Sequence, residues 1–191
     1  MQSVLIVSGL KSQPALIQLL KGCSRQAAPK ISPAQSGTAA RRLLCENDYE
    51  IVLINTPLSD EFGHELALDA ARNSQAGVLL LVKNEQADAV AAKVEEEGVF
   101  ILSKPLSREL FYQALKLVQA ARRLLQGMQQ ENRRLQGKIE EIRLCDRAKC
   151  ALIQYGGFTE PQAHRYIEKR AMDERRIRRE IAEEVLRTYE G

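Results

Sequence analysis

Apolar residues recur at three- and four-residue steps through about fifty proline-free positions between Pro105 and Tyr155. This period is typical of one face of a helix, and its persistence predicts a coiled coil. The stripe begins with Leu110, Ala114 and Ala121, and the expected pairing residues are Leu117, Leu124, Met128, Asn132, Leu135, Ile139 and Ile142. Such a helix would extend roughly 70 Å at 1.5 Å per residue. Because a small domain cannot cover that length, we expect a homodimer.

Before this helix, short apolar runs alternate with helical patterns. Four runs read as buried parallel strands, with a weaker fifth near Ile31: Val4–Val7, Ile51–Ile54, Val78–Val82 and Val99–Leu102. Helical patterns fill the intervals at Pro14–Cys23, Thr38–Glu46, Glu61–Asn73 and Gln86–Glu97. Five such units with short connections predict an α/β fold of the (βα)5 type, in which helices cover both faces of a parallel sheet.

Functional groups in such folds lie beyond the carboxyl ends of the strands. The residues expected at this edge are Ser8, Gly9, Asn55, Val82 and Lys104. None of them carries a carboxylate, so the edge offers little to hold a hard divalent cation. We therefore expect neither a metal ion nor another cofactor here.

This half of the chain, roughly residues 1–118, resembles a response-regulator receiver domain, which has a flavodoxin-like fold. The resemblance rests on Ile51-Val52-Leu53-Ile54-Asn55-x-Pro57-Leu58, Asp60-x-x-Gly63 and Lys104-Pro105. It implies that Asn55 stands where the phospho-acceptor aspartate belongs. Ser8 and Gly9 replace the metal-binding acids, and Val82 replaces the switch Ser or Thr, so only Lys104 is retained. Because an amide cannot form an acyl phosphate, the resemblance predicts a pseudo-receiver that is not controlled by phosphorylation.

The last third of the chain predicts a bundle of three helices. Gly156-Gly157 ends the long helix, Thr159 is a suitable N-cap, and Pro161 falls in the first turn of a helix over about Glu160–Asp173. This helix places Ala163, Tyr166, Ile167 and Ala171 near one side. A third helix follows, with the expected core residues Ile177, Ile181, Ala182, Val185 and Leu186.

This region is similar to an ANTAR domain, the RNA-binding module of transcription antiterminators, over about residues 136–189. The matching segments are Arg147-Ala148-Lys149-x-x-Leu152, Gly157-x-x-Glu160-x-x-Ala163, Ile167-Glu168-Lys169-x-Ala171-Met172 and Ile181-Ala182-x-x-Val185-Leu186. Cys150 and Ile153 depart from the family's usual glycine and methionine. The resemblance implies that a dimer holds paired hairpins of a leader RNA and so affects RNA polymerase indirectly, by preventing a terminator.

Charge agrees with a polyanionic partner for the second half. Residues 1–106 carry 10 Lys and Arg against 12 Asp and Glu, whereas residues 107–191 carry 18 against 13. The candidate RNA-binding residues are Arg147, Lys149, His164, Arg165, Lys169 and Arg170, with Lys149 and Lys169 preferred because they lie in the matching motifs. Tyr166 is either a stacking ring or a core residue, and the arginines at 175, 176, 178 and 179 are either contacts or a solvated face balanced by acids.

The sequence thus predicts a pseudo-receiver over 1–118, a coiled-coil linker over 119–135 and an ANTAR domain over 136–191. The four cysteines lack metal-site spacing, no apolar run approaches a membrane span, and the chain opens without a signal peptide, so we expect a cytoplasmic protein. The sequence contains no nucleophile–base pair and no phosphate-binding loop that would indicate an enzyme.

The leading function is RNA-binding antitermination. The regulatory signal would come from a partner protein, from a small ligand bound at the strand ends, or from the expression level alone. A protein-interaction scaffold is the alternative, and DNA binding is a third.

Overall fold

A computed structural model describes residues 3–23 and 29–190. The chain forms two compact units, one up to Gln126 and one from Gly127 onward. This division falls inside the predicted linker, 119–135. Each unit has its own buried core, and the two are described separately below.

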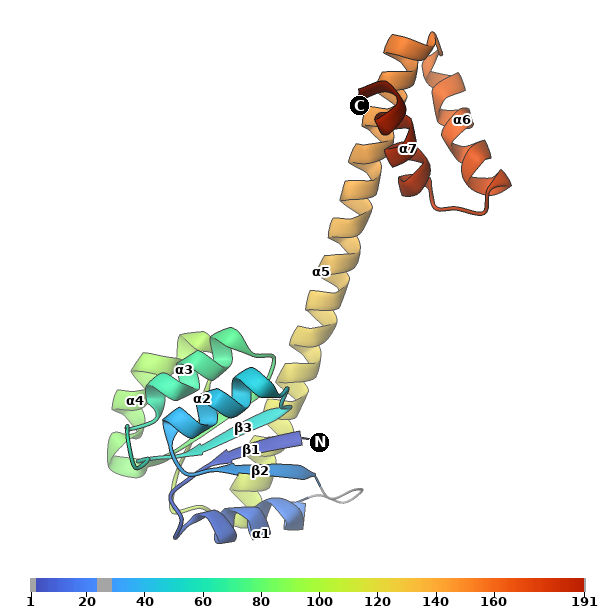
Figure 1. Ribbon diagram of the computed structural model, residues 1–191. Coiled ribbons are helices and arrows are strands. Elements are labelled where there is room, and N and C mark those ends of the chain that lie inside the picture. Colours follow the sequence, from blue (N-terminus) through green and yellow to red (C-terminus); the bar gives the residue numbers. More distant parts are fainter. Residues whose placement is uncertain (1–2, 24–28, 191) are drawn as a thin grey trace. The chain divides into compact units, whose positions relative to one another are not determined.

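The first unit contains a five-stranded parallel sheet in the order β2-β1-β3-β4-β5 (Figure 1). The strands are β1 Ser3–Val7, β2 Lys30–Ala34, β3 Ile51–Asn55, β4 Gly77–Lys83 and β5 Phe100–Lys104. The helices are α1 Gln13–Cys23, α2 Gly37–Glu46, α3 His64–Asn73, α4 Ala87–Val94 and the start of α5 Arg108–Gly156. The predicted alternation of strand and helix, and the parallel sheet, are confirmed.

Successive residues of each central strand belong to different cores because side chains alternate between the faces of a sheet. On β3, Val52 and Ile54 pack with α2, α3 and α4, while Ile51 and Leu53 pack with α1 and α5. Both sets are fully buried. This explains why the strands read as continuous apolar runs, and Figure 1 shows α1 on the opposite side of the sheet from α2 and α3.

Two predicted helices were too long. The helix expected from Glu61 begins at His64, because Gly63 adopts a left-handed conformation (φ 107°) that ends the preceding loop. The helix expected over Gln86–Glu97 is α-helical only as α4, with single 3₁₀ turns at Asn84–Gln86 and Glu95–Glu97. The predicted core position Ile177 was also wrong, since it precedes α7 and its side chain is 61% exposed.

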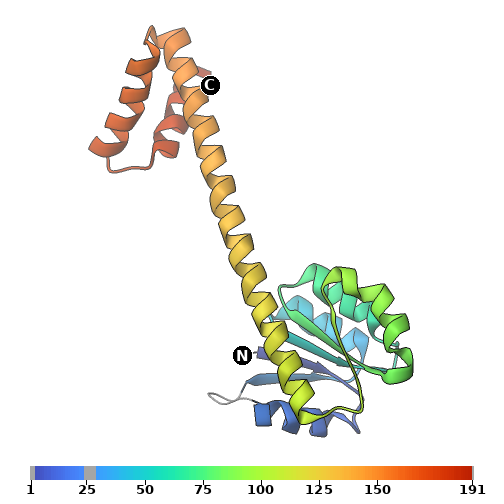
Figure 2. The ribbon, with the colours of Figure 1, turned by 180° about the vertical axis from the view of Figure 1, so that it is seen from behind.

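The long helix is confirmed as the single helix α5. Its first turns lie against the sheet (Figure 2). They pack on it through Phe111, Leu115 and Val118, a face one position away from the predicted stripe. The Cβ of an alanine at Gly77 would lie 2.3 Å from Val118, so β4 approaches the helix closely at that point. The stripe itself remains outside: Leu117 and Leu124 are 59% and 66% exposed in the single chain.

In the second unit, the end of α5 packs against α6 Glu160–Asp173 and α7 Arg178–Glu190. The contact positions include several alanines, which let the helices approach closely: Ala148, Ala151, Ala163, Ala171 and Ala182. Larger residues fill the space between them, among them Leu152, Ile167, Ile181, Val185 and Leu186. The predicted three-helix bundle is confirmed, including the bounds of its second helix.

Candidate functional site

At the strand ends of the first unit, Asn55 is held by two hydroxyl groups. Its amide nitrogen donates to Ser8 Oγ and Ser12 Oγ, both at 3.0 Å, and the two hydroxyl oxygens are 3.1 Å apart. The Gly9 carbonyl accepts a hydrogen bond from each serine, at 3.3 and 3.4 Å. A neutral hydrogen-bonded cluster therefore occupies this edge. Ser12 was not foreseen, because it lies beyond the strand.

Lys104 closes the other side of this edge. Its ammonium group donates to the backbone carbonyl of Thr56. Burial lowers the pKa of Lys104, and the positive charge of Lys83 lowers it further. Val82 is fully buried in the core beneath α2–α4. Four of the five predicted residues therefore lie at one edge of the sheet, namely Ser8, Gly9, Asn55 and Lys104. Val82 instead belongs to the buried core.

The nearby acids are committed to α2. Asp60 accepts hydrogen bonds from the backbone N–H groups of Gly37 and Thr38, at 2.8 and 3.0 Å, and from the Thr38 hydroxyl. Glu61 forms a bidentate ion pair with Arg41, at 2.7 and 3.0 Å. Within the described residues, no three His, Cys, Asp or Glu side chains come together in a way that would hold a metal ion.

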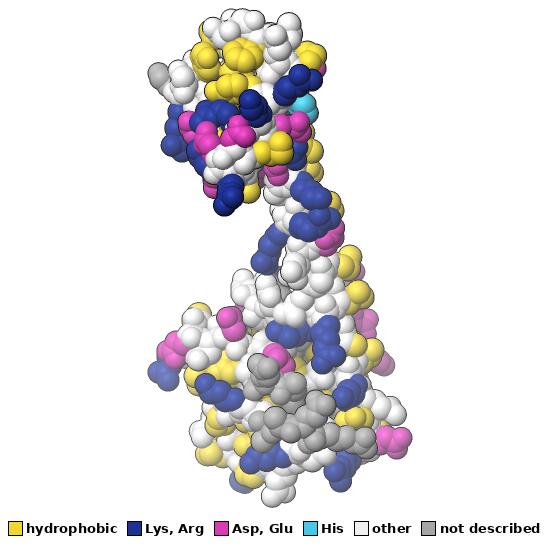
Figure 3. Space-filling model, turned by 90° about the vertical axis from the view of Figure 1, so that its right-hand side faces the viewer, with side chains coloured by type: hydrophobic (Ala, Val, Ile, Leu, Met, Phe, Trp, Pro, Cys, Tyr) yellow, Lys and Arg dark blue, Asp and Glu magenta, His cyan; other side chains and the backbone are white. Residues whose placement is uncertain are grey.

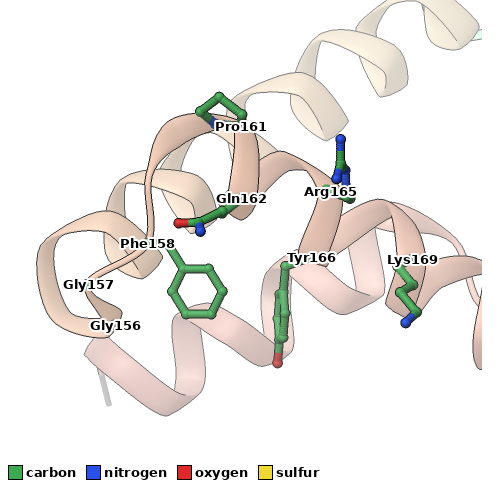
Figure 4. A pocket seen from close by; sticks show the side chains of 8 residues that line it. All are labelled: Gly156, Gly157, Phe158, Pro161, Gln162, Arg165, Tyr166 and Lys169. Atoms are coloured by element: carbon green, nitrogen blue, oxygen red, sulfur yellow. The ribbon is translucent and has the colours of Figure 1, made fainter.

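The second unit contains an open hollow of about 530 Å³ at the start of α6 (Figure 4). Its eight lining residues are Gly156, Gly157, Phe158, Pro161, Gln162, Arg165, Tyr166 and Lys169. The rings of Phe158 and Tyr166 meet edge to face, with centroids 5.4 Å apart. Gly157 has a positive φ of 69°, and an alanine Cβ at Gly156 would lie 2.9 Å from the Phe158 ring, so the two glycines let the chain fold back here.

Two cations of α6 face this hollow without a carboxylate partner. Arg165 and Lys169 are exposed, and within residues 3–23 and 29–190 neither forms an ion pair. They lie four residues apart, so they share one side of the helix. Aromatic faces beside uncommitted cations are the chemistry that binds unpaired nucleic-acid bases and their phosphates.

The other predicted contacts are engaged elsewhere. Lys149 is 2.8 Å from Asp146 and 3.6 Å from Glu160, and the hydrogen bond to Asp146 is the main cause of its raised pKa. Arg170 bonds Glu174 and Glu184, both at 2.7 Å, and its guanidinium lies 5.8 Å from the centre of the Tyr166 ring. His164 pairs with Glu168, and Arg147 lies exposed on α5.

Three of the arginines that follow α6 also have carboxylate partners, namely Arg176, Arg178 and Arg179. Arg176 contacts Glu174, Glu180 and Glu184 at 2.8–3.1 Å, which ties the turn after α6 to α7. Arg178 and Arg179 are paired as well, with Glu141, Glu168, Glu140 and Glu183. For these three arginines the structure favours a solvated face balanced by acids over a set of RNA contacts.

Sequence reasoning missed Phe158 and Gln162 as members of the hollow. A signal for Gln162 was present, because Thr159-x-x-Gln162 has the spacing of a capping box. In the structure the Thr159 backbone N–H donates to the Gln162 side-chain oxygen at 2.9 Å, as in a capping box, and the Thr159 hydroxyl donates to the same oxygen at 2.9 Å. Phe158 carried no comparable signal, since its place depends on the glycine turn before it.

Residues 133–186 match the model of the ANTAR domain. The C-terminal region is an ANTAR domain. The hollow therefore lies in it, between the end of α5 and α6. The sequence analysis expected this domain over about residues 136–189, so both ends of the match lie three residues earlier than expected.

Two curated relatives align with most of the chain. The transcriptional regulatory protein PdtaR of Mycobacterium tuberculosis is 27% identical over 158 residues, covering 83% of this chain and 77% of PdtaR. The aliphatic amidase regulator of Pseudomonas aeruginosa is 28% identical over 190 residues, covering 96% and 89%. The chain thus contains an ANTAR domain and is similar to transcriptional regulators over most of its length, as the sequence predicts.

Solved structures share the fold of the first unit. The receiver domain of an HD domain-containing protein from Pseudomonas fluorescens Pf-5 has a TM-score of 0.55 at 20% identity and covers 66% of this chain and 92% of its own. A response regulator receiver domain from Clostridium thermocellum has a TM-score of 0.57 at 18% identity, with coverage of 65% and 99%. These likenesses confirm the receiver fold in front of the ANTAR domain. No helix within residues 3–23 and 29–190 combines the length and apolarity that a membrane crossing needs.

Proposed function

We propose that this protein is an RNA-binding transcription antiterminator. It acts as a dimer in which each ANTAR domain holds one of two hairpins in a leader RNA. This prevents a terminator from forming, so the effect on RNA polymerase is indirect. The named relatives, a transcriptional regulatory protein and an aliphatic amidase regulator, support the regulatory class over most of the chain.

The observation that carries the RNA-binding part is the hollow of the ANTAR domain. Phe158 and Tyr166 supply two aromatic faces, and Arg165 and Lys169 supply two cations that have no acid partner among the described residues. A loop base splayed out of a hairpin would lie against a ring while its phosphate meets a cation. We assign Arg165 and Lys169 as the principal phosphate contacts, because Lys149 and Arg170 are already held by carboxylates.

The apolar stripe of α5 supports the dimer. Its leucines, isoleucines and methionine are about half exposed or more in the single chain, and part of this apolar edge is visible in Figure 3. Side chains of this kind are covered when two helices pair by knobs-into-holes packing. Asn132, which is also exposed, would face its mate and fix the register.

The strand-end cluster supports regulation that does not use aspartyl phosphate. Asn55 is an amide that donates to two serines, and Asp60 and Glu61 are bound to α2. Input therefore comes from a partner protein, a small ligand or the amount of the protein itself. The protein would work in the cytoplasm, where leader RNA is made.

The test is selection from a pool of hairpin RNAs that share one stem and have randomised loops. The full-length protein should enrich a subset of loops, and duplex DNA of the same sequences should not compete. An enriched pair of hairpins placed before a terminator should then increase read-through in a purified transcription reaction. If no hairpin is enriched, the RNA-binding proposal is wrong and a protein-interaction scaffold takes its place. Competition by duplex DNA would favour a DNA-binding protein.

A further inference from the structure

The side-chain amide of Gln162 has only one possible orientation. Both the backbone N–H and the hydroxyl of Thr159 contact the same Gln162 atom, each at 2.9 Å. A backbone N–H can only donate, so that atom must be the amide oxygen. The oxygen is thereby occupied by the start of α6. The amide nitrogen keeps both of its hydrogens for a ligand, because Gln162 is exposed and lines the hollow (Figure 4).

The remaining polar side chains of the hollow are donors as well. The guanidinium of Arg165 and the ammonium of Lys169 can donate but cannot accept. The Tyr166 hydroxyl oxygen accepts from Arg170 at 3.5 Å, which leaves its hydrogen available. The walls between these groups are the rings of Phe158 and Tyr166. A ligand that matches this lining is flat and presents hydrogen-bond acceptors.

We propose that the hollow selects an unpaired guanine or uracil by its O6 or O4 keto oxygen, which accepts a hydrogen bond from the amide nitrogen of Gln162. This inference rests on the proposed RNA binding and adds the kind of base that is read. Adenine and cytosine place an amino group where guanine and uracil have the keto oxygen. With either of them, two N–H groups would face each other and one donor would lose its partner. Glutamine reads adenine when its oxygen accepts from the amino group, but here that oxygen is engaged by Thr159.

The substitution Gln162→Glu separates reading from folding. Glutamate in this position of a capping box still offers an oxygen to Thr159, so α6 begins as before. The donor nitrogen becomes a carboxylate oxygen, which accepts from the amino groups of cytosine and adenine. The added negative charge weakens RNA binding in general. Gln154→Glu is the matched control, because Gln154 is exposed at the end of α5 in the same unit and does not line the hollow.

The experiment applies one RNA pool, with a common stem and a randomised loop, to the full-length wild type and both variants. In wild type and Gln154→Glu, one loop position should favour guanine or uracil over adenine and cytosine by about fivefold, the scale of one net hydrogen bond. In Gln162→Glu this preference should be lost or reversed. Replacing a selected guanine by 2-aminopurine removes O6, and replacing a selected uracil by 2-pyrimidinone removes O4. Either replacement should cost the wild type about fivefold in affinity and the Gln162→Glu variant nothing.

The outcomes distinguish the two proposals. Enrichment of hairpins with the same base preference in all three proteins would overturn the reading by Gln162 while leaving RNA binding intact. A wild-type preference for adenine or cytosine at every selective position would overturn it too. A pool from which no hairpin is enriched would remove RNA binding itself, and the reading of a base with it.

Discussion

Asp60 accepts two hydrogen bonds from backbone N–H groups at the start of α2, and these are the main reason that its pKa falls to about 2. The group is exposed, so water screens part of this effect. A carboxylate at the N-terminus of a helix also interacts favourably with the helix dipole. The loop between β3 and α3 is thereby anchored to the start of α2.

Replacing Asp60 by asparagine should lower stability at neutral pH. Because the pKa is depressed in the folded protein, the contribution of Asp60 is present above about pH 4 and is lost as the pH falls through about 2. The difference in urea midpoint between Asp60→Asn and wild type should therefore shrink steadily from pH 5 downward. Asp48→Asn, at an exposed aspartate beyond α2, is the control. An Asp60 gap that stays constant down to pH 2 would contradict the assignment.

The two preferred lysines differ in what surrounds them. Lys149 lies between Asp146 and Glu160, whereas Lys169 has no carboxylate partner in the described part of the chain. We predict that Lys149→Met costs less than about 1 kcal/mol in stability and weakens hairpin binding less than Lys169→Met. Titration of one labelled hairpin with each variant measures this. If Lys149→Met lowers the affinity for the hairpin more than Lys169→Met does, Lys149 is part of the RNA-binding surface.

At the scale of elements, α5 presents two apolar faces with different uses. Phe111, Leu115 and Val118 are buried on the sheet, and the stripe beside them is open. From Met128 onward the stripe alternates steps of four and three through Asn132 and Leu135, as a heptad requires. Continued backward, that register reaches Leu125 rather than Leu124, and both leucines are exposed. Either leucine can therefore meet a second helix near this point.

The double substitution Leu124→Asp/Leu135→Asp should convert a dimer into monomers. Two carboxylates in the pairing face would be desolvated opposite each other, which costs far more than the lost apolar contact. Light scattering at micromolar concentration measures the change in mass. Gln130→Asp/Gln136→Asp, off the stripe, should leave the mass of a dimer. A wild type that is monomeric under these conditions would refute the paired helix.

For the whole molecule, patterns local to a few residues were enough to predict the architecture. Two strands could be predicted from their apolar runs alone, Val78–Val82 and Ile51–Ile54, because central parallel strands are apolar on both faces. The hollow could not be predicted in this way, because it depends on how the chain turns between α5 and α6. Phe158 contacts Tyr166 only because Gly157 takes a left-handed conformation. Whether Lys149 is available to RNA depends on its ion pairs with Asp146 and Glu160, which belong to different helices. A sequence motif therefore indicates which residue type stands at a position, but not which carboxylates pair with a lysine there.

The first unit should not respond to phosphodonors. Incubation of the full-length protein with acetyl phosphate and Mg²⁺ should give no adduct by intact mass and no change in oligomeric state. The reason is that Asn55 cannot form an acyl phosphate and that Asp60 and Glu61 are bound to α2. An adduct accompanied by a change in elution volume on sizing would show a working receiver.

The salt dependence of hairpin binding tests the central claim most directly. Each phosphate contact contributes roughly 0.7 to the slope of log affinity against log salt for single-stranded RNA. We predict that Arg165→Ala/Lys169→Ala weakens binding of a selected hairpin and flattens this slope by about 1 to 1.5. The paired arginines provide the control, so Arg178→Ala/Arg179→Ala should change both much less. If the control pair abolishes binding while the Arg165/Lys169 pair leaves affinity and slope unchanged, the RNA does not bind at this hollow.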